Sequence, residues 1–111
     1  MPEVTCVGIL VADVVGSPID EMPGHGKLAR VERMELHSGG CAANTGVALA
    51  KLGVETAIIG KVGEDGFGDF LVRRFEAHGV NIQGLARDKE TATAATMVMV
   101  HSDGAGGGIN L

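Results

Sequence analysis

Residues 4–15 form an almost continuous apolar run, rich in Val and Ile. Such a run is typical of a strand that is buried on both faces. Asp13 interrupts it near its carboxyl end. A carboxylate there must be paired, hydrogen-bonded or directed into a cleft, because burying it alone is costly. Strand ends line the ligand cleft of open α/β sheets, so Asp13 is a candidate binding residue. The alternative is a solvated Asp at a strand end.

Residues 41–52 are apolar nearly all round, which predicts a buried helix. Gly39 and Gly40 precede this helix, and Asn44 is its only carboxamide. A Gly-Gly turn lets backbone N–H groups approach a ligand closely, and the first helical turn adds unpaired N–H donors. The segment is therefore a candidate binding turn, although a generic strand-to-helix turn would also use glycine.

Further strands and a second helix are predicted around this segment. Residues 28–37 alternate between apolar and polar, as in a half-exposed strand of a small flap sheet. Residues 54–62 predict a buried strand, and Asp65 is placed to cap a helix that stops at Gly79. The order strand, helix, strand, helix predicts a parallel α/β layer.

Residues 91–100 are β-prone and lead into a turn at 102–104, which predicts the first arm of a hairpin. The returning arm is expected to be missing, because residues 105–111 are mostly small and flexible. We expect residues 102–111 to be flexible and residues 1–111 to form a single, partial domain.

Composition excludes several classes of function. The formal net charge is −5, without a run of Lys or Arg, and the chain has no Trp or Tyr, so nucleic acid is not an expected partner. No apolar stretch is long enough to cross a membrane, and no signal peptide is recognised. Cys6 and Cys41 lack metal-ligand spacing, so no metal site or disulfide is expected. These features favour a cytoplasmic protein.

The glycine pattern does not match the common nucleotide loops. GxxxxGK[ST] is absent, and residues 63–68 read GxxGxG, not the dinucleotide motif GxGxxG. The glycines at 104–106 have no helix behind them. An α/β domain of one of these nucleotide-binding families would need a phosphate loop that the sequence does not contain.

Three motifs together closely resemble the N-terminal signature of the ribokinase-like (PfkB) carbohydrate kinases. They are Gly-Gly-Cys-Ala-Ala-Asn-Thr-Gly at 39–46, Gly53, and Gly-Lys-Val-Gly-Glu-Asp-Gly-Phe-Gly at 60–68. A first strand ending in Asp13 and a Thr-rich strand before the Ser-Asp-Gly turn agree with this resemblance. It implies a ribokinase-like fold with a parallel α/β core layer and a small β-sheet lid.

The resemblance also implies an ATP-dependent phosphotransferase that acts on a sugar. Asp13 and Asn44 would bind sugar hydroxyls, and Gly39 and Gly40 would offer backbone contacts and a lid hinge. Ribose-specific members of the family tend to have Asn two positions before the Asp and often Lys after the Gly pair, where this chain has Val11 and Cys41. These departures argue against ribose as the substrate.

The family's ATP site and catalytic Asp lie in a part that this sequence lacks. ATP and Mg²⁺ are therefore expected to bind the full-length parent and not this chain, which on this reading is truncated and inactive alone. The alternative is a non-catalytic module that binds a sugar, or that forms a homodimer through its lid strands, because unpaired strand edges favour pairing.

Overall fold

The computed structural model describes residues 1–111, which form two compact units. The first unit comprises Met1–Ala12 and Ser38–Ala94, and the second comprises Asp13–His37 and Ala95–Leu111. Three points of the chain therefore mark the boundary, after Ala12, after His37 and after Ala94. No helix has the length and apolar character that crossing a membrane requires.

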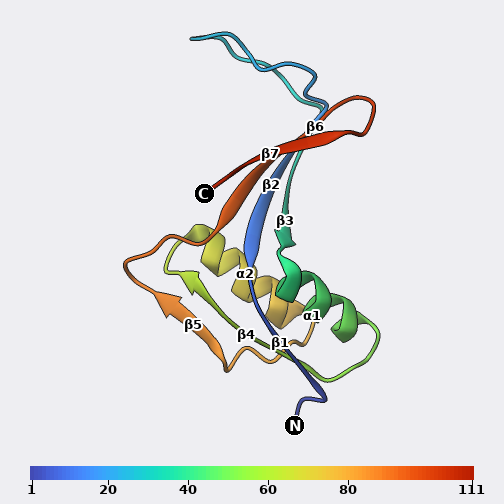
Figure 1. Ribbon diagram of the computed structural model, residues 1–111, viewed down its shortest axis with the longest axis vertical. Helices are drawn as coiled ribbons and strands as arrows, with labels where there is room; N and C mark the ends of the chain where they lie inside the picture. Colours follow the sequence, from blue (N-terminus) through green and yellow to red (C-terminus); the bar gives the residue numbers. More distant parts are fainter. The chain divides into compact units, whose positions relative to one another are not determined.

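The first unit is built on a parallel sheet in the order β1-β4-β5 (Figure 1). Its strands are β1 (Val4–Val7), β4 (Thr56–Gly63) and β5 (Leu85–Asp88). In the register, Cys6 lies opposite Ile58 and Val62 lies opposite Arg87. The predicted parallel α/β layer is confirmed.

Helices α1 (Cys41–Lys51) and α2 (Gly66–Ala77) pack against the sheet of the first unit. Gly46 of α1 allows this packing, because a Cβ at this position would lie 2.7 Å from the Cδ1 of Ile58. The core comprises Cys6, Leu10, Ala12, Ala42, Ala43, Val47, Ile58, Val62, Leu71, Phe75 and Val80. Val7 and Ile59 are 72% and 45% exposed, so part of the sheet's apolar surface is uncovered in this chain.

Two expectations about these elements are wrong. The apolar run at 4–15 is not one strand buried on both faces: it divides into β1 and β2 (Val11–Ser17), which belong to different sheets. The apolar helix α1 is buried on one side only, through Ala42, Ala43, Gly46 and Val47. Leu49 and Ala50 are partly buried against the core, whereas Cys41, Asn44, Thr45, Ala48 and Lys51 are exposed.

Most residues of a four-stranded sheet, in the order β3-β2-β6-β7, lie in the second unit. Its other strands are β3 (Arg33–Gly39), β6 (Ala95–Val100) and β7 (Gly106–Asn110). β6 and β7 are antiparallel, and the register runs from Thr96 opposite Asn110 to Val100 opposite Gly106. The predicted hairpin is confirmed, but its returning arm is present as β7, so that expectation is wrong.

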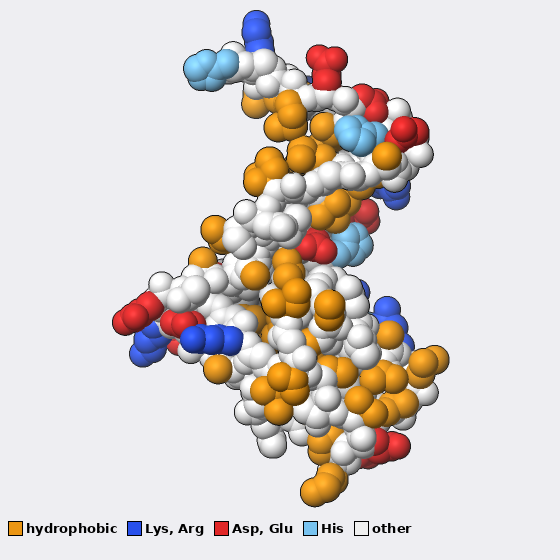
Figure 2. Space-filling model, in the orientation of Figure 1, with side chains coloured by type: hydrophobic (Ala, Val, Ile, Leu, Met, Phe, Trp, Pro, Cys, Tyr) orange, Lys and Arg blue, Asp and Glu red, His pale blue; other side chains and the backbone are white.

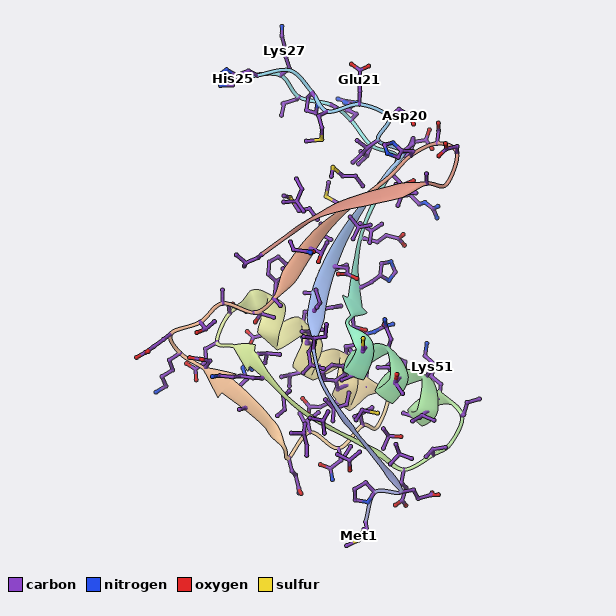
Figure 3. The ribbon with its side chains drawn as sticks, in the orientation of Figure 1. Met1, Asp20, Glu21, His25, Lys27 and Lys51 are labelled. Carbon is purple, nitrogen blue, oxygen red and sulfur yellow. The ribbon has the colours of Figure 1, made fainter.

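The second unit contains an apolar hollow of about 310 Å³ between its sheet and the loop at 18–32. Asp20 lies at the base of this loop, and His25 and Lys27 lie at its far end (Figure 3). Four of the chain's five methionines line the hollow. Hydrophobic side chains are also visible below the loop in Figure 2. Major lining residues are Val14, Ile19, Met22, Leu28, Val31, Met34, Met97, Met99 and Ile109.

Candidate functional site

Asp13 is the third residue of β2 and the first residue of the second unit. It is half-buried, and it follows Ala12, which is 0% exposed. The N–H of Ala12 donates to the carbonyl of Ala94 at 3.0 Å. Val14 lines the apolar hollow, and successive side chains of a strand point to opposite faces. The carboxylate of Asp13 therefore lies on the other face of β2.

Gly39 and Gly40 end β3 and begin α1, and they differ in conformation. Gly39 is buried and does not have a positive φ. Gly40 is the N-cap residue of α1, with φ +90°. A Cβ at Gly40 would overlap the carbonyl of Ile9 and lie 3.3 Å from the Cα of Leu10. Packing and backbone conformation both require glycine at this position, apart from any ligand.

Asn44 lies in the first turns of α1, where its backbone N–H donates to the carbonyl of Gly40 at 2.9 Å. The residue is exposed, so its carboxamide is open to a ligand. Gly40 provides no side-chain cap for the preceding N–H groups of the helix. The beginning of α1 therefore combines backbone donors with a side chain that can both donate and accept.

Three of the four predicted site residues, Gly39, Gly40 and Asn44, lie in one continuous segment of the first unit. Asp13 belongs to the second unit. Their joint role in sugar binding stays a prediction.

The sequence did not predict a hydrogen-bonded pair formed by Asp65 and Thr93. Asp65 Oδ1 accepts from the N–H of Gly68 at 2.8 Å, which confirms the predicted helix cap. Asp65 Oδ1 also accepts from Thr93 Oγ1 at 2.6 Å, and Oδ2 accepts from Thr93 N at 2.9 Å. Thr93 Oγ1 in turn accepts from the N–H of Gly63 at 2.8 Å. The hydroxyl of Thr93, followed by its N–H and that of Gly68, lowers the pKa of Asp65, so this carboxylate is ionised at neutral pH.

A second group of charges lies beside this pair, at the carboxyl ends of β4 and β5. Lys61 Nζ lies 2.8 Å from Asp88 Oδ2, and this bond, with the N–H of Glu90, lowers the pKa of Asp88 to about 2. Arg87 donates from Nε to the carbonyl of Gly63 at 3.1 Å. These contacts fix the turn that joins β4 to α2.

Comparison with known proteins shows the family of this chain. The model of the pfkB family carbohydrate kinases matches residues 1–106. The chain belongs to this family. Fructokinase-2 of Zea mays is 37% identical over 94 residues, which cover 85% of this chain and 25% of the maize protein.

Solved structures agree with this family assignment. The chain resembles the ribokinase of Arabidopsis thaliana, determined with ribose and ATP, with a TM-score of 0.87 and 27% identity. It also resembles the nucleoside kinase of Methanocaldococcus jannaschii, with a TM-score of 0.81 and 26% identity. These matches cover 99% and 100% of this chain and 36% and 37% of the two kinases. The predicted ribokinase-like fold is confirmed, and the chain spans between a quarter and two fifths of each relative.

Proposed function

We propose that this chain is the sugar-binding part of an ATP-dependent sugar kinase, which transfers a phosphoryl group from ATP to a sugar hydroxyl. The match of residues 1–106 to the pfkB family carries this proposal. The exposed Asn44 at the beginning of α1 and the half-buried Asp13 support it. A cytoplasmic location stays a prediction.

The side chains and backbone groups that we propose for this site suit the binding of a polyol. The carboxylate of Asp13 only accepts hydrogen bonds, whereas the carboxamide of Asn44 donates and accepts. Backbone N–H groups after Gly40 add donors without a competing side-chain cap. Together these groups match hydroxyls that act both as donors and as acceptors. A hinge at Gly39 and Gly40 is compatible with the unit boundary after His37.

We propose that the ATP–Mg²⁺ site of the intact kinase lies outside this chain. No group of three or more His, Cys, Asp or Glu side chains is arranged to hold a metal ion, and no P-loop is present in the sequence. Phosphoryl transfer requires that both the sugar hydroxyl and the γ-phosphate are positioned. We therefore assign only the first task to this chain and propose that the phosphate donor and the catalytic base belong to residues outside it.

The test is a coupled ADP-release assay on the intact protein that carries this chain, with ATP, Mg²⁺ and a panel that includes D-fructose and D-ribose. We expect sugar-dependent ADP release from the intact protein, and none from residues 1–111 alone. An intact protein that no sugar in the panel stimulates would contradict a sugar kinase. Turnover by residues 1–111 would contradict the division of tasks.

The apolar hollow supports a second candidate function, which is association with a second copy. A sheet needs a second layer to bury an apolar face, and the main strand contacts of helices α1 and α2 are with β1 and β4. Met22, Met34, Met97 and Ile109 are more than 45% exposed, and methionines adapt to partner surfaces. Lys27 and Glu21 lie on the same loop (Figure 3), so this loop carries both signs of charge, which is compatible with a self-complementary interface.

The substitution Met97→Asp tests this association. We expect light scattering to give the mass of a dimer for the unaltered chain and of a monomer for Met97→Asp, because a carboxylate cannot be buried unpaired in an apolar interface. Lys89→Asp, at an exposed position of the first unit, is the control and should leave the dimer intact. A monomeric unaltered chain would exclude this candidate.

A further inference from the structure

One backbone hydrogen bond is made by the residue directly before Asp13, the residue proposed to bind the sugar. The N–H of Ala12 donates to the carbonyl of Ala94 at 3.0 Å, and Ala12 is 0% exposed. A buried backbone bond of this kind is costly to break. Because Asp13 is the next residue, this bond to Ala94 holds the backbone directly before Asp13.

Ala94 in turn follows Thr93, which is 1% exposed and is held by side-chain and backbone hydrogen bonds. Its hydroxyl donates to Asp65 Oδ1 and accepts from the N–H of Gly63, and its own N–H donates to Asp65 Oδ2. Two of these bonds end on an ionised carboxylate and are stronger than neutral hydrogen bonds. Thr93 is thus fixed to the turn between β4 and α2.

Capping of α2 does not account for this arrangement. A cap needs only the bond from Gly68 N to Asp65 Oδ1. The second oxygen of Asp65 is used by Thr93, which lies 28 residues further along the chain. The carboxylate therefore joins two segments of the first unit, and the second of them leads to the unit boundary after Ala94.

We propose that Asp65 and Thr93 are positioning residues for Asp13. They hold the carbonyl of Ala94 in the place where it accepts the N–H of Ala12, and they thereby fix the backbone from which the carboxylate of Asp13 reaches the sugar. This proposal rests on the proposed function, since it assigns the pair a role in sugar binding.

The first measurement is amide hydrogen exchange of residues 1–111, which needs no sugar. Thr93→Val removes the hydroxyl at nearly constant shape, Thr93→Ser retains it, and Asp65→Asn keeps the cap but places an amide group against the N–H of Thr93. We expect Thr93→Val and Asp65→Asn to raise the exchange rate of the Ala12 N–H at least tenfold relative to that of Phe75 in α2. Thr93→Ser should restore the unaltered ratio.

Asp20→Asn is the matched control, because Asp20 Oδ1 accepts from both the N–H and the hydroxyl of Ser102, but in the second unit. It should leave the exchange ratio of Ala12 to Phe75 unchanged. If Thr93→Val accelerates both amides equally, the pair is merely structural and the proposal is wrong. An unchanged Ala12 rate in Thr93→Val and Asp65→Asn would overturn it as well.

The second measurement is made on the intact kinase with D-fructose and ATP. We expect Thr93→Val to raise the KM for the sugar at least fivefold with the KM for ATP within twofold, and to add nothing to the effect of Asp13→Ala. Independent, multiplying effects of the two substitutions would overturn the proposal. If Asp13→Ala itself leaves the sugar KM unchanged, the proposed site is wrong, while the exchange ratio still shows whether Thr93 fixes Ala12.

Discussion

Asp13→Ala in the intact kinase is expected to lower kcat/KM for the sugar by about 12- to 160-fold, because a hydrogen bond to a charged group contributes about 1.5–3 kcal/mol. The KM for ATP should stay within twofold, since no residue of this chain is assigned to the phosphates. Asp13→Asn retains the size of the side chain and removes its charge, so an intermediate loss is expected. Steady-state kinetics with each substrate varied in turn measures both constants.

Asn44→Ala tests the other proposed side chain. The expected loss in kcat/KM is smaller, about 2- to 12-fold, because a bond between neutral groups contributes about 0.5–1.5 kcal/mol. Glu21→Ala is the control: this carboxylate is exposed on the loop of the second unit (Figure 3), and its removal should change neither constant. Unchanged sugar kinetics in both Asp13→Ala and Asn44→Ala would refute the site assignment.

The elements that sequence reasoning placed well are those with a local signal. The strand at 54–62 and the two helices have the expected apolar content and stop signals, and the structure places them at Thr56–Gly63, Cys41–Lys51 and Gly66–Ala77. The cap at Asp65 also depends only on neighbours in the chain. Signals of this kind depend on a few neighbouring residues, so they predict an element without knowledge of the tertiary structure.

The elements that sequence reasoning missed depend on pairing between strands that are distant in the sequence. Strand β7 contains three consecutive glycines, which have low strand propensity, and it forms because its backbone pairs with β6 and because Thr96 Oγ1 donates to Asn110 Oδ1 at 2.6 Å. The division of the apolar run at 4–15 depends likewise on which strands each half meets. Apolar content shows that such residues are buried or paired, but not to which sheet they belong.

The candidate site was predictable only in part, for the same reason. The chemistry of Asp13 and Asn44 is visible in the sequence, and the family signature supplies their expected role. The bonds from Asp65 to Thr93 join residues 28 positions apart, and nothing local to either residue indicates the other. The structure was needed to show that Gly40 is required by the backbone of Ile9.

Gly40→Ala is expected to destabilise residues 1–111 by about 2–5 kcal/mol. A positive φ costs an L-residue about 1–2 kcal/mol, and forcing a methyl group into a packed region costs typically about 1–3 kcal/mol more. The new Cβ would overlap the carbonyl of Ile9, where the beginning of α1 lies against the segment between β1 and β2. Urea unfolding followed by circular dichroism measures the loss.

Gly53→Ala is the matched control, because Gly53 has φ +87° but no atom within 4 Å of the added Cβ. It should lose only the conformational part, about 1–2 kcal/mol, so the difference between the variants isolates the contact with Ile9. Equal losses would show that Ile9 moves aside at little cost. A larger loss in Gly40→Ala means that packing alone already requires glycine there. Weakened sugar binding in that variant would then not identify a ligand contact, and the case for the site depends on Asp13 and Asn44.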